Sequence, residues 1–565
     1  MRFHLVSLNA RFIHSSTPLF TLRNELTRHL PDCAATLFHF TINDSYFETL
    51  LTLSGGEPDA IFFSVYIWNA DLVERLVQDL EKIDSPCPII LGGPQVTYGR
   101  ESEWPEGCTL VRGEVEGLPE RFFRDLQARR LGREYAAPPA EAFPSPYREE
   151  DLRGPLKNRY IYYESTRGCP FACTYCLSSA DRGIREKELP LVEQELSAIL
   201  AHNPKSLRFV DRTFNVNGQR ALTLWKFLAA RAKGTQCHFE IAPHLFDDEM
   251  FESLRTVPTG LFHFEIGLQT TNPDSLAAVH RSTNQEKAES NIARLAALET
   301  VHLHLDLILG LPFETVETFR RSFNTVFSLN PHYIQMGLLK VLPGTELDRQ
   351  KGEFGLLASS QPPYQVMGSR WMRHDELREL FWFGECVEAF YNNRYFLSLF
   401  QYLRKVETDP AVFFEKLLQV CRERDFFNLS PTQELMVQCL VAVVKDRTDG
   451  LLMLDLMRYD WLRCGHRFLP DCLQRGGPVQ EARENLWSRL PLNYPPFFDH
   501  RTRKNFLRRA VFARFSHEVL QELGFQADQD SWLAFLPETT DTLFKLSRTI
   551  RLPSRPGSAS GTEGR

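Results

Sequence analysis

Two long stretches of the chain alternate short apolar runs with segments of helical spacing, and this alternation limits the fold more than any other feature. In residues 1–128 the apolar runs are FHLVSL, AATLFHF, AIFFSVY, PIILGG and TLVRG. They are typical of buried strands, and the segments between them, such as NADLVERLVQDLEKI, have the period of amphipathic helices. The pattern predicts a doubly wound, Rossmann-like parallel sheet, which binds ligands at the carboxyl ends of its strands.

The second alternating stretch begins at residue 159 and ends near residue 350. Its strand candidates are IYYESTRG, SLRFVDR, CHFEIA, LFHFEIGLQ, VHLHLDLILGL and YIQMGLLKVL, separated by helical stretches such as LVEQELSAILAHN. Six strand–helix repeats predict a partial (β/α)6 barrel that is open on one side. Functional groups of parallel barrels gather at the C-terminal ends of the strands.

The chain is therefore predicted to be an α/β protein with a C-terminal all-α domain. A proline-rich segment separates the two alternating stretches and is typical of a linker. Beyond the barrel, the strand pattern gives way to long helical stretches. The predicted parts are the doubly wound domain at 1–128, the linker at 129–158, the barrel domain at 159–370, the helical domain at 371–550 and a polar, disordered tail at 551–565.

Composition places the chain among ordinary globular proteins. Hydrophobic residues make up 43% and charged residues 24% of its 565 residues, and the net charge is −7. This charge gives no global electrostatic reason to bind nucleic acid or an anionic membrane. No apolar run has the length of a membrane span, and the opening MRFHLVSLNA lacks the pattern of a signal peptide. We expect a cytoplasmic protein with reduced thiols that binds neither a membrane nor nucleic acid.

One local exception is the basic run RTRKNFLRRAVFARF at 501–515, which contains no acidic residue. It has the charge to hold an anionic substrate or RNA. A solvated helix face explains the same run, and this is our expectation for it.

Three cysteines follow the first predicted strand of the barrel with the spacing C-x3-C-x2-C: Cys169, Cys173 and Cys176. Three thiolates in one loop can hold three irons of a [4Fe–4S] cluster and leave the fourth iron open to a substrate or cofactor. A zinc site with three protein ligands and a chance group of buried cysteines are the alternatives. Most of the other nine cysteines are predicted to be small core residues. An alternative second metal site lies at Cys464, Cys472 and His466.

The cysteine spacing, with Tyr175 directly before the third cysteine, resembles the signature of the radical S-adenosylmethionine (SAM) superfamily. The resemblance implies that SAM chelates the open iron through its amino and carboxylate groups. It also implies that the reduced cluster cleaves SAM to a 5′-deoxyadenosyl radical, which abstracts hydrogen from a substrate. An external one-electron donor of the flavodoxin or ferredoxin type is then an expected partner.

Further positions in the barrel resemble SAM-binding positions of this superfamily. They lie in the stretches VDRTFNVN, FEIAPH, FEIGLQT, VHRST and DLILGLPFET. Arg281 is predicted to pair with the carboxylate of SAM, because a guanidinium forks well onto a carboxylate. For Glu240, Glu265 and Arg281 the alternative is an internal ion pair of the barrel. The predicted SAM residues are Tyr175, Asp211, Glu240, Glu265, Gln269, Arg281 and Gly310.

The N-terminal domain resembles the vitamin B12 (cobalamin)-binding domain. Its first loop reads NARFIHSST, and Ser64-Val65-Tyr66 and Gly92-Gly93 follow at a separation close to that of the family. Glycines at these positions let the nucleotide tail of the cofactor pass close to the backbone. An ordinary tight turn is the alternative for Gly92-Gly93. The predicted cobalamin residues are Asn9, His14, Ser15, Ser64, Tyr66, Gly92, Gly93, Gly113, Glu114 and Gly117.

His14 lies in the loop from which that family supplies a lower ligand to cobalt. Phe12 and Thr17 stand where the family has aspartate and glycine. The aspartate would orient the imidazole, as the outer partners of metal-binding histidines do. Without it, we expect His14 to leave the cobalt unligated and to bond loop backbone or the nucleotide tail instead.

Over nearly its whole length the chain resembles an uncharacterised family of cobalamin-binding radical SAM proteins with a helical C-terminal domain. The resemblance implies an enzyme with a [4Fe–4S] cluster, SAM, cobalamin and a small-molecule substrate. The expected reaction is methyl transfer from cobalamin to an unactivated carbon. The alternatives are a cobalamin-assisted rearrangement or ring contraction without methylation, and a non-catalytic cobalamin or redox sensor.

Overall fold

The computed structural model describes residues 1–83, 87–99, 104–180, 183–281, 283–474, 503–539, 543–544 and 546–552. Contacts divide the chain into two compact units. The first unit holds residues 1–301, 308–316 and 337–377, and the second holds 302–307, 317–336 and 378–565. The predicted disordered tail lies outside the described residues from 553 onward.

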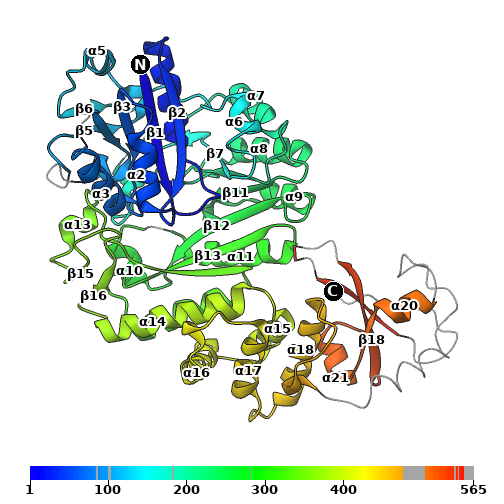
Figure 1. Cartoon of the computed structure of the whole chain (residues 1–565). Helices are drawn as coiled ribbons and strands as arrows, with labels where there is room; N and C mark the ends of the chain where they lie inside the picture. The colour runs from blue at the N-terminus through cyan, green and yellow to red at the C-terminus, as the bar shows by residue number, and fades with distance from the viewer. Residues whose placement is uncertain are drawn as a thin grey trace. The chain divides into compact units, whose positions relative to one another are not determined.

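A six-stranded parallel sheet forms the beginning of the first unit, in the order β2-β1-β3-β4-β5-β6 (Figure 1). Helices cover both of its faces, because one apolar cluster includes side chains of α1 and α5 and another includes those of α2 and α3. The predicted doubly wound parallel sheet is confirmed. Its strands are β1 (Arg2–Asn9), β2 (Ala34–Thr41), β3 (Ala60–Ser64), β4 (Ile89–Gly92), β5 (Thr109–Gly113) and β6 (Glu134–Ala137). Its helices are α1 (Thr17–His29), α2 (Tyr46–Ser54), α3 (Ala70–Leu80), α4 (Pro94–Tyr98) and α5 (Glu120–Gln127).

The second sheet has the order β14-β13-β12-β11-β10-β7. Its strands in the first unit are parallel neighbours and alternate with helices, as the periodicity predicts. Those strands are β7 (Ile161–Tyr163), β10 (Ser206–Phe209), β11 (Gln236–Glu240) and β12 (Phe262–Gln269), and β13 (His302–Leu309) and β14 (Tyr333–Leu338) complete the order. The intervening helices are α7 (Leu189–Leu200), α8 (Gly218–Arg231), α9 (Asp248–Arg255), α10 (Pro273–Ala278), α11 (Gln285–Leu298) and α12 (Val316–Ser328).

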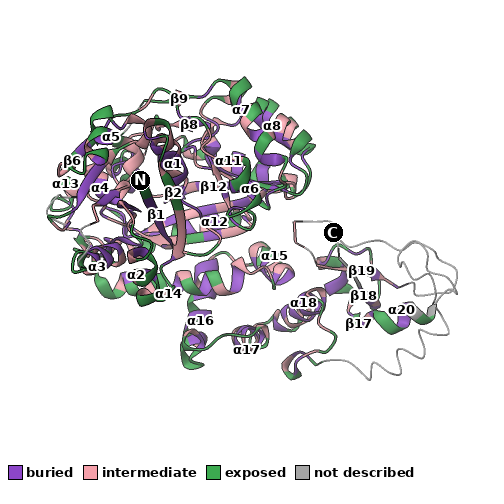
Figure 2. Ribbon diagram, turned by 45° about the horizontal axis from the view of Figure 1, so that its top comes forward, coloured by how far each residue is buried: buried purple, intermediate pink, exposed green. Residues whose placement is uncertain are grey.

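Side chains alternate strictly between buried and partly exposed along β12 and β13, the two longest strands of this second sheet. In β12, every second residue is buried and the residues between are partly exposed. Phe239 and Phe264 pack against Trp225 of α8, so the buried face is the helix-covered face. In Figure 2, helices of this domain such as α7 and α8 carry exposed residues on their outer sides. The opposite face of the sheet is therefore the one that presents polar side chains.

A short antiparallel pair frames the cysteine loop. Strand β8 (Thr166–Arg167) directly precedes it and pairs with β9 (Arg185–Glu186), which follows it. The pair fixes both ends of the loop, so the three cysteines lie in a tethered segment near the carboxyl end of β7.

The second unit contains the helices predicted for the C-terminal region and a sheet that was not predicted. Residues 511–551 depart from the all-α prediction, because β17, β18 and β19 pair into an antiparallel sheet. Its sequences, VFARF and SWLAFLPET, are rich in the aromatic and apolar residues that favour strands. The helices are α15 (Leu397–Val406), α16 (Pro410–Glu423), α17 (Gln433–Val444), α18 (Gly450–Arg463), α20 (Arg503–Arg509) and α21 (His517–Glu522), and the strands are β17 (Val511–Phe515), β18 (Ser531–Thr539) and β19 (Ser547–Arg551).

The basic run at 501–515 is divided between α20 and β17, and its first two residues lie outside the described part. Within the described residues, no helix has both the length and the hydropathy that crossing a membrane requires.

Candidate functional site

The cysteine loop brings two buried thiols and one partly exposed thiol together. Cys169 and Cys173 are buried, whereas Cys176 is partly exposed. Burial raises the pKa of the Cys169 thiol. The guanidinium of Arg281 donates from Nη1 to Cys173 Sγ over 3.5 Å and to the hydroxyl of Tyr175 over 3.3 Å. Arg281, which follows β12, therefore binds both Tyr175, the predicted aromatic position, and a cysteine of the loop.

Three thiols in one tethered loop suit a [4Fe–4S] cluster. Among the described residues, no group of three or more His, Cys, Asp or Glu side chains is arranged to hold one metal ion. Thiolates of a [4Fe–4S] cluster bind separate irons, so they need not converge on one point.

Arg281 is already engaged inside the barrel. Besides Cys173 and Tyr175, it donates from Nη2 to the carbonyl oxygen of Gly267. A Cβ atom on Gly267 would lie 2.1 Å from Nε2 of Gln269 and 3.4 Å from Nη2 of Arg281. Gly267 therefore makes room for two of the predicted SAM residues, which lie beside each other at the end of β12.

Asp211 holds the turn that leads into the cysteine loop. It is fully buried, and its carboxylate accepts hydrogen bonds from the backbone nitrogen and the hydroxyl of Ser165 at 2.7 and 2.5 Å. Burial raises the pKa of Asp211 to about 6. Its role as a SAM contact remains a prediction, and its observed role is to position the start of the loop.

The two predicted glutamates have partners within the barrel. Glu240 Oε1 lies 3.7 Å from Nη1 of Arg212, and Glu265 Oε2 lies 2.8 Å from Nε2 of His238. Both are internal pairs of the barrel, which is the alternative to SAM binding for these two glutamates. Gly310 directly follows β13 and adopts a positive φ of 87°.

Several predicted cobalamin residues line one apolar pocket at the carboxyl ends of β3, β4 and β5. The pocket has about 460 Å³ of empty space, including the solvent at its mouth. Gly93 has φ 114°, and a Cβ atom there would lie 2.5 Å from the carbonyl oxygen of Val65. Gly113 has φ 110°, and its Cβ would lie 1.8 Å from the oxygen of Ala137. The lining residues are Pro18, Leu19, Leu22, Phe62, Phe63, Ser64, Ile90, Gly92, Gly93, Val111, Gly113, Val115, Leu118 and Phe122.

The polar residues predicted near this pocket are held by local hydrogen bonds. Ser64 accepts a hydrogen bond of 3.1 Å from the hydroxyl of Ser16 at the start of α1. Tyr66 is partly exposed and stacks on Trp68 at a centroid distance of 4.3 Å. Asn9 is buried at the end of β1 and donates to Ser7 Oγ and the oxygen of Phe40. Ser64 thus borders the pocket, whereas Asn9 stabilises the edge of β1.

The loop after β1 is attached to the barrel. His14 Nδ1 shares a hydrogen bond of 2.5 Å with the hydroxyl of Tyr162 on β7, and its ring packs edge-on against Tyr160. Ser15 donates from its hydroxyl to the oxygen of Tyr160 over 3.0 Å. Burial, followed by the charge of Arg208, lowers the pKa of His14. The aromatic partner Tyr162 was not predicted, although the run RYIYYE marks an unusually tyrosine-rich first strand.

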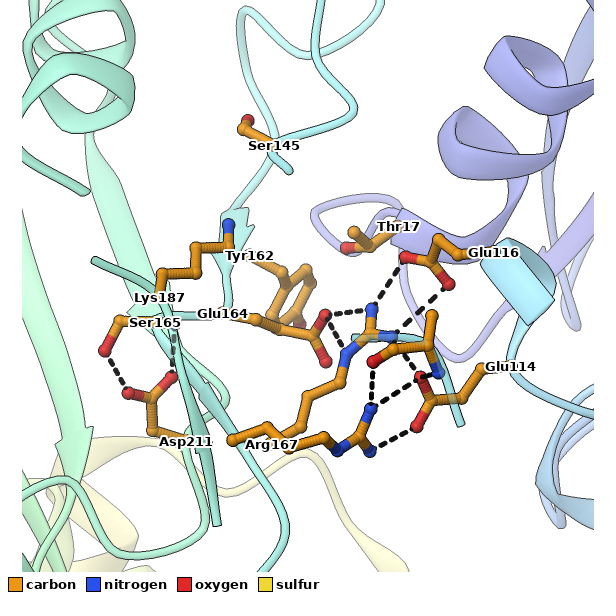
Figure 3. A network of polar contacts seen from close by, with 12 residues as sticks. Thr17, Glu114, Glu116, Ser145, Tyr162, Glu164, Ser165, Arg167, Lys187 and Asp211 are labelled. Atoms are coloured by element: carbon orange, nitrogen blue, oxygen red, sulfur yellow. Dashed lines mark hydrogen bonds and ion pairs between the residues drawn. The ribbon is translucent and has the colours of Figure 1, made fainter. Parts of the chain in front are cut away.

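An ion-pair network joins the glycine turn after β5 to both ends of the cysteine loop (Figure 3). Glu114 lies 2.7 Å from Arg167 and 2.5 Å from Arg185, and Glu116 lies 2.9 Å from Arg167. Burial favours the neutral form of Glu114, but the donors of Arg185, Ala140 and Arg167 outweigh it and hold its pKa below the usual value.

This network accounts for Glu114 and Gly117 in a way that the sequence did not predict. Gly117 ends the turn, and a Cβ atom on it would lie 1.9 Å from the oxygen of Pro138. Glu114 was predicted to contact cobalamin, but its carboxylate binds arginines of β8 and β9. Arg167 and Arg185 themselves were missed, because nothing local in the sequence links them to Glu114, which lies 53 and 71 residues earlier.

The remaining cysteines have ordinary surroundings. Cys108, Cys237, Cys386, Cys421 and Cys439 are buried, as expected for core residues. At the alternative second metal site, Cys464 Sγ contacts the oxygen of Tyr395 and His466 Nε2 contacts Gln433 Oε1 at 2.7 Å. These polar atoms therefore have protein partners.

Comparisons with known proteins agree with the cysteine loop and the two sheets. Residues 163–326 match the radical SAM superfamily, and residues 352–535 match a family described as protein of unknown function (DUF4080). The chain is 25% identical over 431 residues to 2-(S-pantetheinyl)-carbapenam-3-carboxylate methyltransferase of Streptantibioticus cattleyicolor, covering 64% of this chain and 61% of the relative. It is 25% identical over 408 residues to the cobalamin-dependent radical SAM methyltransferase TokK of Streptomyces tokunonensis, covering 61% and 59%.

Solved structures share the fold. OxsB, a cobalamin-dependent SAM radical enzyme solved with aqua-cobalamin, superimposes with a TM-score of 0.56 at 14% identity, covering 82% of this chain and 80% of OxsB. TsrM of Kitasatospora setae, a radical SAM methyltransferase, gives a TM-score of 0.51 at 17% identity, covering 65% and 80%. The chain thus contains a radical SAM domain, is homologous to cobalamin-dependent radical SAM methyltransferases and carries a C-terminal region of the uncharacterised DUF4080 family.

Proposed function

We propose that this protein is an enzyme that uses a [4Fe–4S] cluster, SAM and cobalamin to transfer a methyl group to an unactivated carbon of a small molecule. The observation that carries the proposal is the network of Arg167, Arg185 and Glu114. It holds the cysteine loop against the glycine turn beside the apolar pocket, within one compact unit. Similarity to two methyltransferases, over about three fifths of their length, supports the same reaction.

The pocket of the first sheet fits the apolar part of a cobalamin tail. Gly93 and Gly113 line the pocket and pack so closely on the backbone of Val65 and Ala137 that a Cβ atom would clash there, and Ser64 adds a hydroxyl to the lining. Most of the other lining residues are aliphatic or aromatic. Such a surface gains free energy by covering an apolar ring system, because apolar area leaves water.

Cys169, Cys173 and Cys176 would hold the cluster, and Tyr175, Gln269 and Arg281 would lie closest to its SAM. When bound, the cluster supplies one-electron reduction of SAM, and cobalamin supplies a transferable methyl group. Asp211 fixes the turn before the loop through Ser165, so the thiols keep their positions. Arg281 donates to the sulfur of Cys173 and so sets a positive charge beside the cluster ligands.

The proposal includes an external one-electron donor of the flavodoxin or ferredoxin type, because the cluster must be reduced before each cleavage of SAM. It also includes a cytoplasmic location, where low-molecular-weight thiols keep cysteines reduced. The other cobalamin and SAM residues predicted from the sequence remain part of the proposal as ligands. Glu114, Glu240 and Glu265 do not, because their carboxylates bind arginine or histidine side chains of the protein.

The test is anaerobic reconstitution of the full chain with iron, sulfide, hydroxocobalamin, SAM and a chemical reductant, followed by product analysis. Transfer of a methyl group from SAM to the reduced cobalamin predicts S-adenosylhomocysteine, and cleavage of SAM at the cluster predicts 5′-deoxyadenosine. Formation of 5′-deoxyadenosine alone would favour the rearrangement without methylation. The absence of both products, in protein that carries its cluster, would favour the non-catalytic sensor.

A further inference from the structure

Four polar side chains form one row across the second sheet. Strand register places Tyr162 beside Arg208, Arg208 beside His238 and His238 beside His263, on the adjacent strands β7, β10, β11 and β12. Their sequence neighbours point the other way, as Phe209 and Phe239 stack on each other and pack toward α8. The row therefore lies on the face of the sheet opposite the helices.

Arg208 carries the unbalanced charge of this row. Its guanidinium lies over the ring of Tyr160 at 4.3 Å, and its Nε is buried without a hydrogen-bond partner. No ion pair of Arg208 is present among the described residues. The nearest carboxylates in register are committed elsewhere, since Glu240 faces Arg212 and Glu265 binds His238.

A cation that is partly withdrawn from water without an anion is costly, whereas a guanidinium that meets a carboxylate or phosphate forms two parallel hydrogen bonds. The surroundings of Arg208 offer further polar atoms. Tyr162 lies in the neighbouring register position, and its hydroxyl shares a hydrogen bond with His14. On the other side, His238 is 6% exposed and its Nδ1 has no partner.

We infer that Arg208 binds the anionic group of the substrate, a carboxylate or a phosphate, with Tyr162 beside it on the neighbouring strand. The inference rests on the proposed function, because it takes the bound molecule to be the substrate of that reaction. The row lies directly before the segments that carry Cys169 on one strand and Asp211 on the next. An anion held there anchors the substrate on the polar face, below the cysteine loop.

SAM and cobalamin carry anionic groups of the same chemistry, and the proposed function gives each another place. It assigns the carboxylate of SAM to the open iron of the cluster and the phosphodiester of cobalamin to the tail in the pocket near Gly93. The anion at Arg208 is therefore assigned to the substrate. The test therefore includes both cofactors as competitors.

The experiment measures binding of inorganic phosphate to the full chain by broadening of its 31P resonance, without any turnover. Wild type should broaden the signal, Arg208→Gln should lose the effect and Arg208→Lys should keep it in weakened form, because lysine retains charge without the fork. Arg255→Gln is the matched control, since Arg255 is an exposed arginine of α9 with a side chain 61% exposed. Acetate should displace phosphate, whereas SAM and hydroxocobalamin should not.

Equal broadening by wild type and Arg208→Gln, or no broadening by wild type, would overturn the inference. Displacement by SAM or hydroxocobalamin would assign the site to that cofactor and likewise overturn it. If Arg208→Gln fails to fold, the Arg208→Lys comparison and protection of Arg208 from phenylglyoxal by phosphate decide in its place. One-site mass action predicts about tenfold slower modification when phosphate is at about ten times its Kd. Since 5′-deoxyadenosine formation is measured separately, failure of this site and failure of the proposed function are distinguishable.

Discussion

The two sheets of the first unit carry different kinds of residue where parallel sheets bind ligands. At the carboxyl ends of the first sheet, Gly92, Gly93 and Gly113 border a pocket whose other walls are mostly aliphatic and aromatic. The second sheet presents charged and hydrogen-bonding side chains instead, among them Arg208 and His238. The first site depends on glycines, which have no side chain. The second depends on polar side chains that the strand alternation places on one face.

The difference teaches which changes each site tolerates. A pocket made by glycines loses its ligand when atoms are added, because the added Cβ meets backbone that cannot move far. A site made of side chains loses its ligand when atoms are removed, and it responds to charge. The network around Arg167 joins the two, so its loss should weaken the connection without filling or emptying either site.

The largest expected effect is at the cysteine loop, which also depends on side chains. Cys173→Ala should abolish the cluster and all cleavage of SAM, because a [4Fe–4S] cluster that already leaves one iron open cannot lose another thiolate. Iron and sulfide analysis should fall from about four of each per chain, and 5′-deoxyadenosine should disappear. Cys237→Ala is the control, since Cys237 is a buried core cysteine of β11. A Cys173→Ala protein that still forms 5′-deoxyadenosine would remove the cluster assignment.

The opposite kind of change should disable the first sheet. Gly93→Leu should weaken binding of hydroxocobalamin by about tenfold or more, which corresponds to about 1.4 kcal/mol or more. The leucine Cβ would lie 2.5 Å from the oxygen of Val65, so the backbone at Gly93, which lines the pocket, would have to shift. Gly234→Leu has a similar positive φ of 76° with nothing within 4 Å of its Cβ, so it controls for backbone strain. Equal loss of binding in both variants would show that strain, and not the pocket, matters.

The ion-pair network of Arg167 should contribute to the free energy of unfolding. Arg167→Ala leaves Glu114, Glu116 and Glu164 without their shared cation, and Arg167 is only 16% exposed. We expect the free energy of unfolding of the first unit to fall by about 3 kcal/mol, as when one partner of a largely buried ion pair is removed. Denaturant titration measures it.

The control for that prediction is an exposed pair of the same domain. Arg121→Ala removes an ion pair with Asp125 in which Arg121 is 73% exposed, and should change stability by less than about 1 kcal/mol. Similar losses in Arg167→Ala and Arg121→Ala would mean that the network does not hold the turn to the loop.

A buried carboxyl after β13 should make stability depend on pH. Glu314 is fully buried, and burial raises its pKa to about 8. Between about pH 4.5 and 8 the folded chain keeps a proton that the unfolded chain releases, so stability falls as the pH rises through this window. Glu314→Gln should remove about 2 kcal/mol of this decline between about pH 5.5 and 7.5. The exposed variant Glu252→Gln should keep the wild-type dependence.

The sequence predicted those parts of the molecule whose signal lies within one short segment of the chain. Strand–helix periodicity predicted both parallel sheets, and the cysteine spacing and the glycines at 92, 93 and 113 predicted residues that the structure places around a loop and a pocket. Each of these signals lies within one short segment. The C-terminal sheet was missed because the helical pattern of the preceding residues dominated the prediction, although Ser531–Thr539 is a nine-residue strand.

Partners distant in sequence could not be predicted. Glu114 binds Arg167 and Arg185, and Asp211 binds Ser165, through pairings that exist only once the two sheets and the loop are in place. A repeated H-x-E pattern at 238–240 and 263–265 was a signal that could have indicated the polar row, because its parity puts His and Glu on one face.

The smallest expected effect concerns His14, which stands between the two sheets. Its ring lies against Tyr160 and shares a hydrogen bond with Tyr162, and burial lowers its pKa. Phe12, at the position of the orienting aspartate, is exposed and lies under Arg159. The imidazole is thus bound to the barrel, so we expect it not to ligate cobalt.

Electron paramagnetic resonance of the Co(II) form tests this expectation. Wild type and His14→Ala should give the same spectrum without nitrogen superhyperfine splitting, because neither places an imidazole on the metal. Tyr162→Phe, which removes the hydroxyl but keeps the ring, should also leave the spectrum unchanged. Splitting from one nitrogen that is lost in His14→Ala would show that His14 ligates cobalt after all. In that case Tyr162 would act as the partner that orients the imidazole, the role that aspartate has in the resembling family, and the first sheet would also depend on a side chain of the second.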